Sequence, residues 1–212
     1  MLVTVAHGTR HPTGNDVAPA LTAAAGERLG VPAVTSYVEL SEPLFADVMA
    51  SLPEPAVVVP LLLSTGYHVK VDLPRAAKAA AAPVTLGPAL GPHPQLAVAQ
   101  AERLRDAGAI PGQRVVMVAA GSQDPAAMTD LGAAAGVLAE EWGGEVVLAT
   151  LGGAGRRPAA VVRPGDAVSP YLLAPGRFAE RAREESLGAA LIGDVIGVHP
   201  SVVDLIVTRG RA

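Results

Sequence analysis

The two halves of this chain repeat the same order of short apolar segments and turns, but two histidines that follow these segments in the first copy are missing from the second. His7 and His68 each follow an apolar run that ends in a turn. In the matching segments of the second half, Ala120 stands in the place of His7 and Phe178 in the place of His68. Histidines that served only to form the turns would be needed in both copies. The repeat therefore predicts two similar domains with a single functional site in the first.

The apolar segments predict the same order of strands and helices in both halves. Each half reads as four short strands that alternate with four helices. The strands are rich in Val and Leu without regular polar alternation, which is typical of a parallel sheet covered by helices on both faces. We expect an α/β fold of two similar domains, residues 1–108 and 113–212, each with a four-stranded, mostly parallel sheet. The segment 106–112 is the expected boundary, since its Gly and Pro residues end a helix before a new strand starts.

A length of 212 residues allows one large or two small domains. The expected strands are residues 2–6, 34–39, 56–63, 83–87, 114–119, 145–150, 167–173 and 190–193. The expected helices are residues 15–29, 43–51, 71–81, 94–107, 125–141, 156–162, 177–187 and 200–209.

The amino-acid composition argues against several classes of function. Hydrophobic residues make up 50% of the chain and charged residues 17%, so a large core is available and disorder is not expected. Aromatic residues at 3% and a net charge of −4 argue against nucleic-acid binding by stacking or by bulk electrostatics. Without cysteine, a metal site has to use His and carboxylate ligands. No apolar run reaches the roughly 20 residues that span a bilayer, and we expect a cytoplasmic protein without a membrane partner.

Three candidate metal ligands lie at or just beyond the ends of three predicted strands. Ligands of open parallel sheets collect beyond the carboxyl ends of the strands, and His7, His68 and Glu39 all fall there. The alternative for each histidine is a turn residue bonded to the backbone. Glu42 is the alternative to Glu39, although the pair Glu42-Pro43 is typical of the start of a helix.

Further residues near these turns are candidates for contacts with a bound molecule. The basic residues are expected to form a rim around the site: Arg10, Lys70, Arg75 and Arg177. The alternative is that they are ordinary solvated charges. The candidate hydroxyl residues are Thr9 and Ser64. Neither half has a glycine-rich phosphate-binding pattern or a Gly-x-Ser-x-Gly serine hydrolase motif.

Three motifs in order resemble the sirohydrochlorin chelatase family, the class II tetrapyrrole chelatases of siroheme and cobalamin synthesis. They are Val5-Ala6-His7-Gly8-Thr9-Arg10, Tyr37-Val38-Glu39-Leu40-Ser41-Glu42-Pro43, and the segment from Pro60 through Ser64-Thr65-Gly66-Tyr67-His68-Val69-Lys70 to Pro74. The resemblance covers the first half closely, and the second half is similar to the degenerate partner domain of two-domain members. It implies a tetrapyrrole cleft formed by two α/β domains.

The resemblance also implies an enzyme that inserts a divalent metal, Co²⁺ or Fe²⁺, into sirohydrochlorin. His7 and His68 would bind the incoming ion, with Glu39 as third ligand, and the basic rim would meet the carboxylates of the macrocycle. The metal is a substrate, and Ni²⁺ is also chemically suited to these ligands. No permanently bound cofactor is expected. The alternative hypotheses are that the chain is a non-catalytic tetrapyrrole or metal carrier, or that it is a metal-dependent hydrolase. Because the two halves already supply two domains, we expect a monomer.

Overall fold

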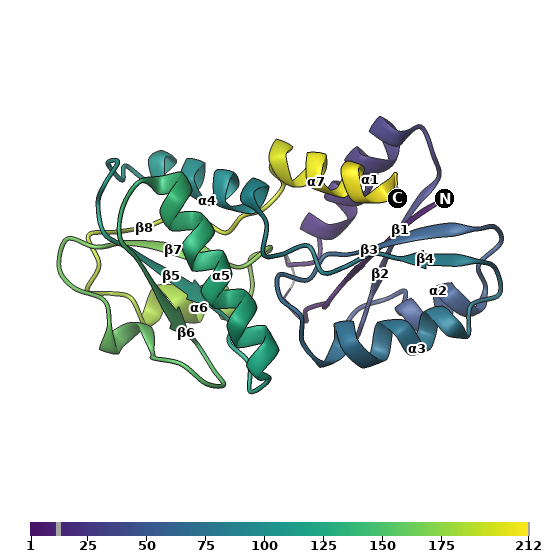
Figure 1. Cartoon of the computed structure of the whole chain (residues 1–212), viewed down its shortest axis with the longest axis horizontal. Coiled ribbons are helices and arrows are strands. Elements are labelled where there is room, and N and C mark those ends of the chain that lie inside the picture. Colours follow the sequence, from purple (N-terminus) through teal and green to yellow (C-terminus); the bar gives the residue numbers. More distant parts are fainter. Residues whose placement is uncertain (12–13, 212) are drawn as a thin grey trace. The chain divides into compact units, whose positions relative to one another are not determined.

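The computed structural model describes residues 1–11 and 14–211 and contains two four-stranded sheets (Figure 1). The first sheet has the strand order β2-β1-β3-β4 and the second the order β6-β5-β7-β8. Every pairing within them is parallel. The α/β fold of two similar sheets with helices, expected from the repeat, is confirmed.

The first sheet is covered by helices on both faces. Its strands are β1 (Leu2–Ala6), β2 (Ala33–Tyr37), β3 (Ala56–Pro60) and β4 (Val84–Leu86), and its helices are α1 (Val17–Leu29), α2 (Phe45–Ala50), α3 (Leu73–Lys78) and α7 (Pro200–Gly210). A π-helical turn, η1 (His68–Asp72), precedes α3. Val3 and Val5 pack with Phe45 of α2 on one face. On the other face, the hydroxyl of Thr4 lies 2.5 Å from that of Thr22 in α1.

The second sheet is built in the same way. Its strands are β5 (Val115–Ala119), β6 (Val146–Thr150), β7 (Ala167–Tyr171) and β8 (Leu191–Ile192), and its helices are α4 (Pro94–Asp106), α5 (Pro125–Trp142) and α6 (Arg177–Glu184). Val116 and Val118 of β5 pack with Ala179 of α6 on one face. On the other, the buried Gln100 of α4 donates to the hydroxyl of Ser169 in β7 at 2.8 Å. No helix among residues 1–11 and 14–211 is long and apolar enough to cross a membrane.

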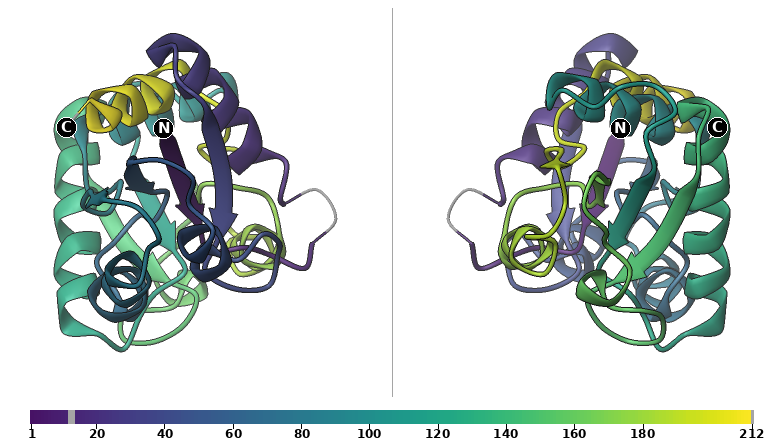
Figure 2. Two further views of the ribbon diagram at one scale, coloured as in Figure 1. Left: turned by 90° about the vertical axis from the view of Figure 1, so that its right-hand side faces the viewer. Right: turned by 90° about the vertical axis from the view of Figure 1, so that its left-hand side faces the viewer.

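The last helix of each half covers the sheet of the other half. One compact unit consists of Met1–Leu90 and the chain from Pro200 onward, and the other of Gly91–His199. Helix α7 packs on α1 and β3, and α4 packs on α5 and β7. Both views of Figure 2 show α7, in yellow, beside the purple α1. These units differ from the expected domains 1–108 and 113–212, because α4 packs on the second sheet and α7 on the first.

Most elements lie close to their predicted ranges, with two exceptions. The helix expected over 156–162 is only a 3₁₀ turn, η2 (Pro158–Ala160), and a second proline at 164 with Gly165 leaves no room for a longer helix. The helix expected over 71–81 instead begins as the π-helical turn η1. A π-turn makes wider i→i+5 hydrogen bonds, and such turns are frequent at functional sites.

The strand order of the first sheet explains why its carboxyl edge suits a ligand. The chain leaves β1 for β2 on one side, and β3 lies on the other side of β1. At such a switch point the loops after β1 and β3 separate and leave a crevice beyond the strand ends. His7 follows β1 there, and His68 lies in the segment that follows β3.

Candidate metal centre

A glycine brings His7 and Glu39 together. His7 directly follows β1, and Glu39 lies two residues after the end of β2. The main-chain N–H of Glu39 donates to the carbonyl oxygen of His7 at 3.1 Å, which continues the strand pairing beyond both strands. Gly8 has a φ of +91°, and a β-carbon on it would overlap the carbonyl group of Glu39. Only glycine fits this conformation and this close approach. The close approach places the side chains of His7 and Glu39 next to each other.

The turn after His7 is fastened to the segment after β2 through the main chain of Thr9. The Thr9 N–H donates to Asn15 Oδ1 and Ser41 Oγ, both at 3.2 Å. Its carbonyl oxygen accepts from Asn15 Nδ2 at 2.8 Å and from Ser41 Oγ at 3.1 Å. The Tyr37 hydroxyl donates to the carbonyl of Asn15 at 3.3 Å. Burial raises the pKa of Tyr37, and the negative charge of Asp16 adds to the rise. These bonds connect the turn after His7 to the segments that follow β2 and precede α1.

His68 is the first residue of the π-helical turn, and Asp72 is the last. The Nδ1 atom of His68 lies 2.8 Å from Asp72 Oδ2. The other carboxylate oxygen, Oδ1, accepts from Arg75 at 3.1 Å. The imidazole is thus held from its Nδ1 side, and its Nε2 side remains for a ligand.

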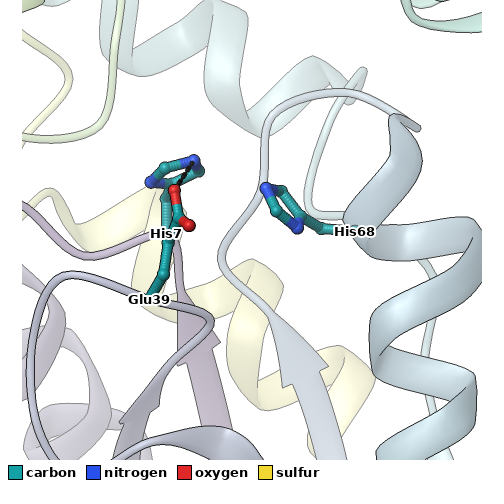
Figure 3. Close-up of side chains that lie close together, drawn as sticks. All are labelled: His7, Glu39 and His68. Atoms are coloured by element: carbon teal, nitrogen blue, oxygen red, sulfur yellow. Dashed lines mark ion pairs between the residues drawn. The ribbon is translucent and has the colours of Figure 1, made fainter.

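The three side chains meet in one cluster, shown in Figure 3. One ligand atom from each of His7, Glu39 and His68 lies within 4.8 Å of the others. His7 Nε2 is 3.5 Å from Glu39 Oε1, and the two imidazole rings lie edge to face with their centroids 5.2 Å apart. Bonds of about 2.0–2.2 Å to an ion place its ligand atoms roughly 3–4 Å apart, so small side-chain rotations would close this set around a metal.

The cluster is open to solvent. The side chains of His7 and Glu39 are 48% and 52% exposed, and that of His68 is 30% exposed. Two imidazoles and a carboxylate suit borderline divalent ions. Three protein ligands in an exposed position leave coordination sites for other groups, as in catalytic metal sites rather than in closed structural ones.

The second unit keeps the backbone of this site without its ligands. The strand registers pair Val5 with Pro60 and Val118 with Pro170, which makes Ala120 and Phe178 the counterparts of His7 and His68, as the sequence repeat indicated. The counterpart of Glu39 is Gly152. Among residues 1–11 and 14–211, a cluster of three candidate ligands therefore occurs in the first unit and not in the second.

Backbone conformation supports the correspondence of Gly152 with Glu39. A β-carbon on Gly121 would overlap the carbonyl group of Gly152, as one on Gly8 would overlap that of Glu39. The next residues also match: Gly153 has a φ of +63°, and Leu40, after Glu39, has a φ of +66°. Leucine in this left-handed region is strained, and such strain persists mostly at functional sites.

Glu42, the alternative third ligand, has a local role. Its Oε2 accepts from the main-chain N–H of Leu44 at 3.0 Å, just before α2 begins. It is not a member of the three-residue cluster. The geometry therefore favours Glu39.

The other predicted contact residues lie in several places. Arg10 and Lys70 are exposed on the two segments that carry the histidines, and Ser64 is half-buried in the turn after β3. Arg75 is 76% exposed but forms an ion pair with Asp72. Arg177 is the exposed first residue of α6, in the second unit. Their contacts with a bound molecule, and that of Thr9, stay predictions.

Sequence reasoning missed the role of Asp72. Its spacing of four residues from His68 was a usable signal, since residues i and i+4 share one face of a helix. The sequence pattern, however, predicts that the helix starts only at residue 71, beyond His68.

Comparisons with known proteins agree with this fold. The CbiX family model matches residues 1–107. SirB from Bacillus subtilis with Fe³⁺ is 26% identical with a TM-score of 0.79, and the match covers 99% of this chain and 93% of that one. The sirohydrochlorin chelatase SirB from Bacillus subtilis subspecies spizizenii, in complex with cobalt, is 25% identical with a TM-score of 0.75 and the same coverage.

A third structure shares the fold. CbiX, described as the terminal enzyme for biosynthesis of siroheme in denitrifying bacteria, is 19% identical with a TM-score of 0.72, over 98% of this chain and 96% of that one. Among curated protein sequences there is no match. The family model covers half of the chain, including all three clustered residues, and the solved structures extend the likeness over nearly its whole length. This chain therefore belongs to the CbiX family, among the sirohydrochlorin chelatases that its motifs resemble.

Proposed function

We propose that this chain inserts a divalent metal ion, Co²⁺ or Fe²⁺, into sirohydrochlorin, as a step of cobalamin or siroheme synthesis. The observation that carries the proposal is the convergence of His7, Glu39 and His68 at the carboxyl edge of the first sheet. Membership of the CbiX family and the likeness to a sirohydrochlorin chelatase in complex with cobalt support the choice of substrate.

The three side chains hold the ion, which is itself a substrate. Imidazole and carboxylate bind borderline ions such as Fe²⁺ and Co²⁺. Because the ion must leave the protein for the macrocycle, a small and exposed ligand set is an advantage over a closed cage. The open coordination positions are available to the pyrrole nitrogens, which replace the protein ligands one after another.

Metal insertion also releases two protons from the pyrrole N–H groups of the macrocycle. A neutral imidazole accepts a proton near physiological pH, so His7 and His68 are suitable proton acceptors as the metal leaves them. Glu39 offsets the positive charge of the ion and of a protonated imidazole. Its carboxylate already lies beside His7, at 3.5 Å from Nε2.

The substrate carries many carboxylates, and exposed cations would bind them. Arg10 and Lys70 are the first-unit candidates, since both are exposed on segments that carry a histidine ligand. Arginine pairs with carboxylates in a bidentate way and lysine as a point charge. Arg75 and Arg177 remain part of the proposed set.

An anaerobic absorbance assay tests the proposal. Purified protein is mixed with sirohydrochlorin, and Co²⁺, Fe²⁺ or Ni²⁺ is added in turn. We expect many turnovers per protein above the uncatalysed rate, and the relative rates rank the metals. His7→Ala and His68→Ala are expected to abolish the acceleration while the far-UV circular dichroism stays unchanged. His11→Ala, which removes a histidine outside the cluster, serves as the matched control.

Two results would overturn the proposal. A spectral change that saturates at one equivalent of protein without turnover would make the chain a carrier. Full activity in both histidine variants would remove the cluster from the reaction.

A further inference from the structure

His68 is held by a residue that is not itself in the cluster. Asp72 Oδ2 lies 2.8 Å from His68 Nδ1, and the Asp72 side chain is only 22% exposed. Its second oxygen pairs with Arg75 at 3.1 Å, so both ends of the carboxylate are engaged. The His68–Asp72 pair spans the whole π-helical turn, from its first residue to its last.

This contact determines which ring nitrogen of His68 carries a proton. An ionised carboxylate only accepts hydrogen bonds, so the Nδ1 atom that contacts Asp72 has to donate one. A neutral His68 is then deprotonated at Nε2, whose lone pair is free for a metal. Metal-binding histidines commonly donate their other N–H to a carboxylate in this way, which fixes the tautomer and the orientation of the ring.

His7 provides a contrast within the same cluster. Its Nδ1 lies 3.3 Å from the carbonyl oxygen of Gly8, a longer contact to the main chain of the next residue. Its Nε2 faces Glu39 at 3.5 Å. Both imidazoles are therefore engaged at Nδ1, but only that of His68 depends on a side chain that can be changed by mutation.

The second unit lacks both members of the pair. Phe178 stands in the place of His68, and Ala182 is four residues further along. The helix there, α6, is α-helical from Arg177 to Glu184 without a π-helical turn. The carboxylate and the π-turn thus occur only in the unit that has the histidine.

From these contacts we propose that Asp72 is a positioning residue, which holds His68 in the Nδ1–H tautomer and directs Nε2 into the cluster with His7 and Glu39. The effect of the His68 tautomer on metal binding rests on the proposed function. Asp72 is not one of the three clustered residues, and in this proposal it acts through His68.

Nitrogen-15 NMR of the metal-free full chain, with labelled histidine, tests the tautomer directly. The signals of His68 are assigned by their loss in His68→Gln. At mildly alkaline pH, where free imidazole is neutral, we expect the proton of wild-type His68 on Nδ1. Asp72→Ala is expected to give a mixture of both tautomers, and Asp72→Asn to retain part of the preference, since its amide oxygen still accepts.

The second readout is the affinity for Co²⁺ alone, measured by titration of the same proteins. Loss of the outer partner of a ligand histidine typically weakens metal binding by about 10–100-fold, which is the effect expected for Asp72→Ala. Asp47→Ala, which removes an exposed aspartate in the first turn of α2, is the matched control and is expected to leave both readouts unchanged.

The outcomes separate this inference from the proposed function. A proton on Nε2 of wild-type His68, or an unchanged tautomer in Asp72→Ala, would overturn the role of Asp72. A wild-type chain that shows the expected tautomer but accelerates no metal insertion would overturn the proposed function alone. Rescue of tautomer and affinity in Asp72→Asn, relative to Asp72→Ala, would support the hydrogen bond as the cause.

Discussion

Gly8 lies so close to the carbonyl group of Glu39 that a β-carbon at residue 8 would overlap it. The same relationship joins Gly121 to Gly152 in the second unit, and both glycines have left-handed backbone conformations, with φ of +91° and +87°. The close approach is therefore a property of the fold. In the first unit it has the additional effect of placing a histidine beside a glutamate.

Gly8→Ala is expected to lower stability and to separate His7 from Glu39. The left-handed conformation costs a residue with a side chain about 1–3 kcal/mol, and the overlap with backbone forces the two segments apart. We expect a lower melting temperature together with weaker binding of Co²⁺, measured by calorimetric titration below the transition.

The matched variant Gly121→Ala creates the same overlap in the unit that has no ligands. We expect a comparable loss of stability with Co²⁺ binding retained. Equal losses of binding in the two variants would show that instability, rather than displacement of the ligands, is the cause.

Glu39→Gln tests the choice between the two glutamates. The amide keeps the size of the side chain but removes the charge, and we expect the affinity for Co²⁺ to fall by at least about tenfold. Glu42→Gln keeps an oxygen that can accept from the Leu44 N–H and is expected to bind Co²⁺ as the wild type does. Titrations that rank the two variants in the opposite order would assign the third ligand to Glu42.

A second metal site is expected from three substitutions in the second unit. Ala120→His, Gly152→Glu and Phe178→His place the missing ligand types on the equivalent backbone. A β-carbon at residue 152 meets its nearest neighbour, the carbonyl oxygen of Ala120, at an ordinary 3.5 Å. We expect the triple variant to bind a second, weaker equivalent of Co²⁺, because it lacks a counterpart of Asp72. A stoichiometry of one would show that the two backbones do not present side chains in the same way.

Asp166→Ala is expected to destabilise the second unit strongly. The Asp166 side chain is 5% exposed, and its Oδ2 accepts from Arg114 at 2.5 Å and from the Arg163 N–H at 2.8 Å. Burial alone would lower the pKa of Arg114, but the hydrogen bonds and charges of Asp166 and Glu145 raise it above its ordinary value. Removing one partner of a buried pair costs about 3–5 kcal/mol, and we expect a loss near the lower end because Arg114 keeps the exposed Glu145 as a partner.

Glu145→Ala is the control for this prediction. Glu145 pairs with the same arginine at 3.1 Å but is 62% exposed, so its loss is expected to cost only about 0–1 kcal/mol. Urea unfolding of both variants measures the difference. Similar midpoints for the two would contradict the dominant role of Asp166.

Much of the fold could be predicted from the sequence, because runs of apolar residues indicate which segments are buried. The Val-rich run before His7 predicted β1 at its observed residues, Leu2–Ala6, and the run before Ala120 predicted β5 within one residue of its observed start. The predictions failed where local signals were ambiguous. Around Pro158, apolar residues suggested a helix that the nearby proline and glycine do not allow.

The sequence by itself determined the two parallel sheets and predicted a single site with two histidines, since these follow from apolar runs, turn residues and a repeat with unequal copies. Only the tertiary structure placed Glu39, rather than Glu42, beside the two histidines, paired Asp72 with His68, and exchanged α4 and α7 between the sheets. Periodicity says that a helix has an apolar face but not which sheet that face covers. With two equivalent sheets in one chain, that choice depends on packing between residues far apart in the sequence.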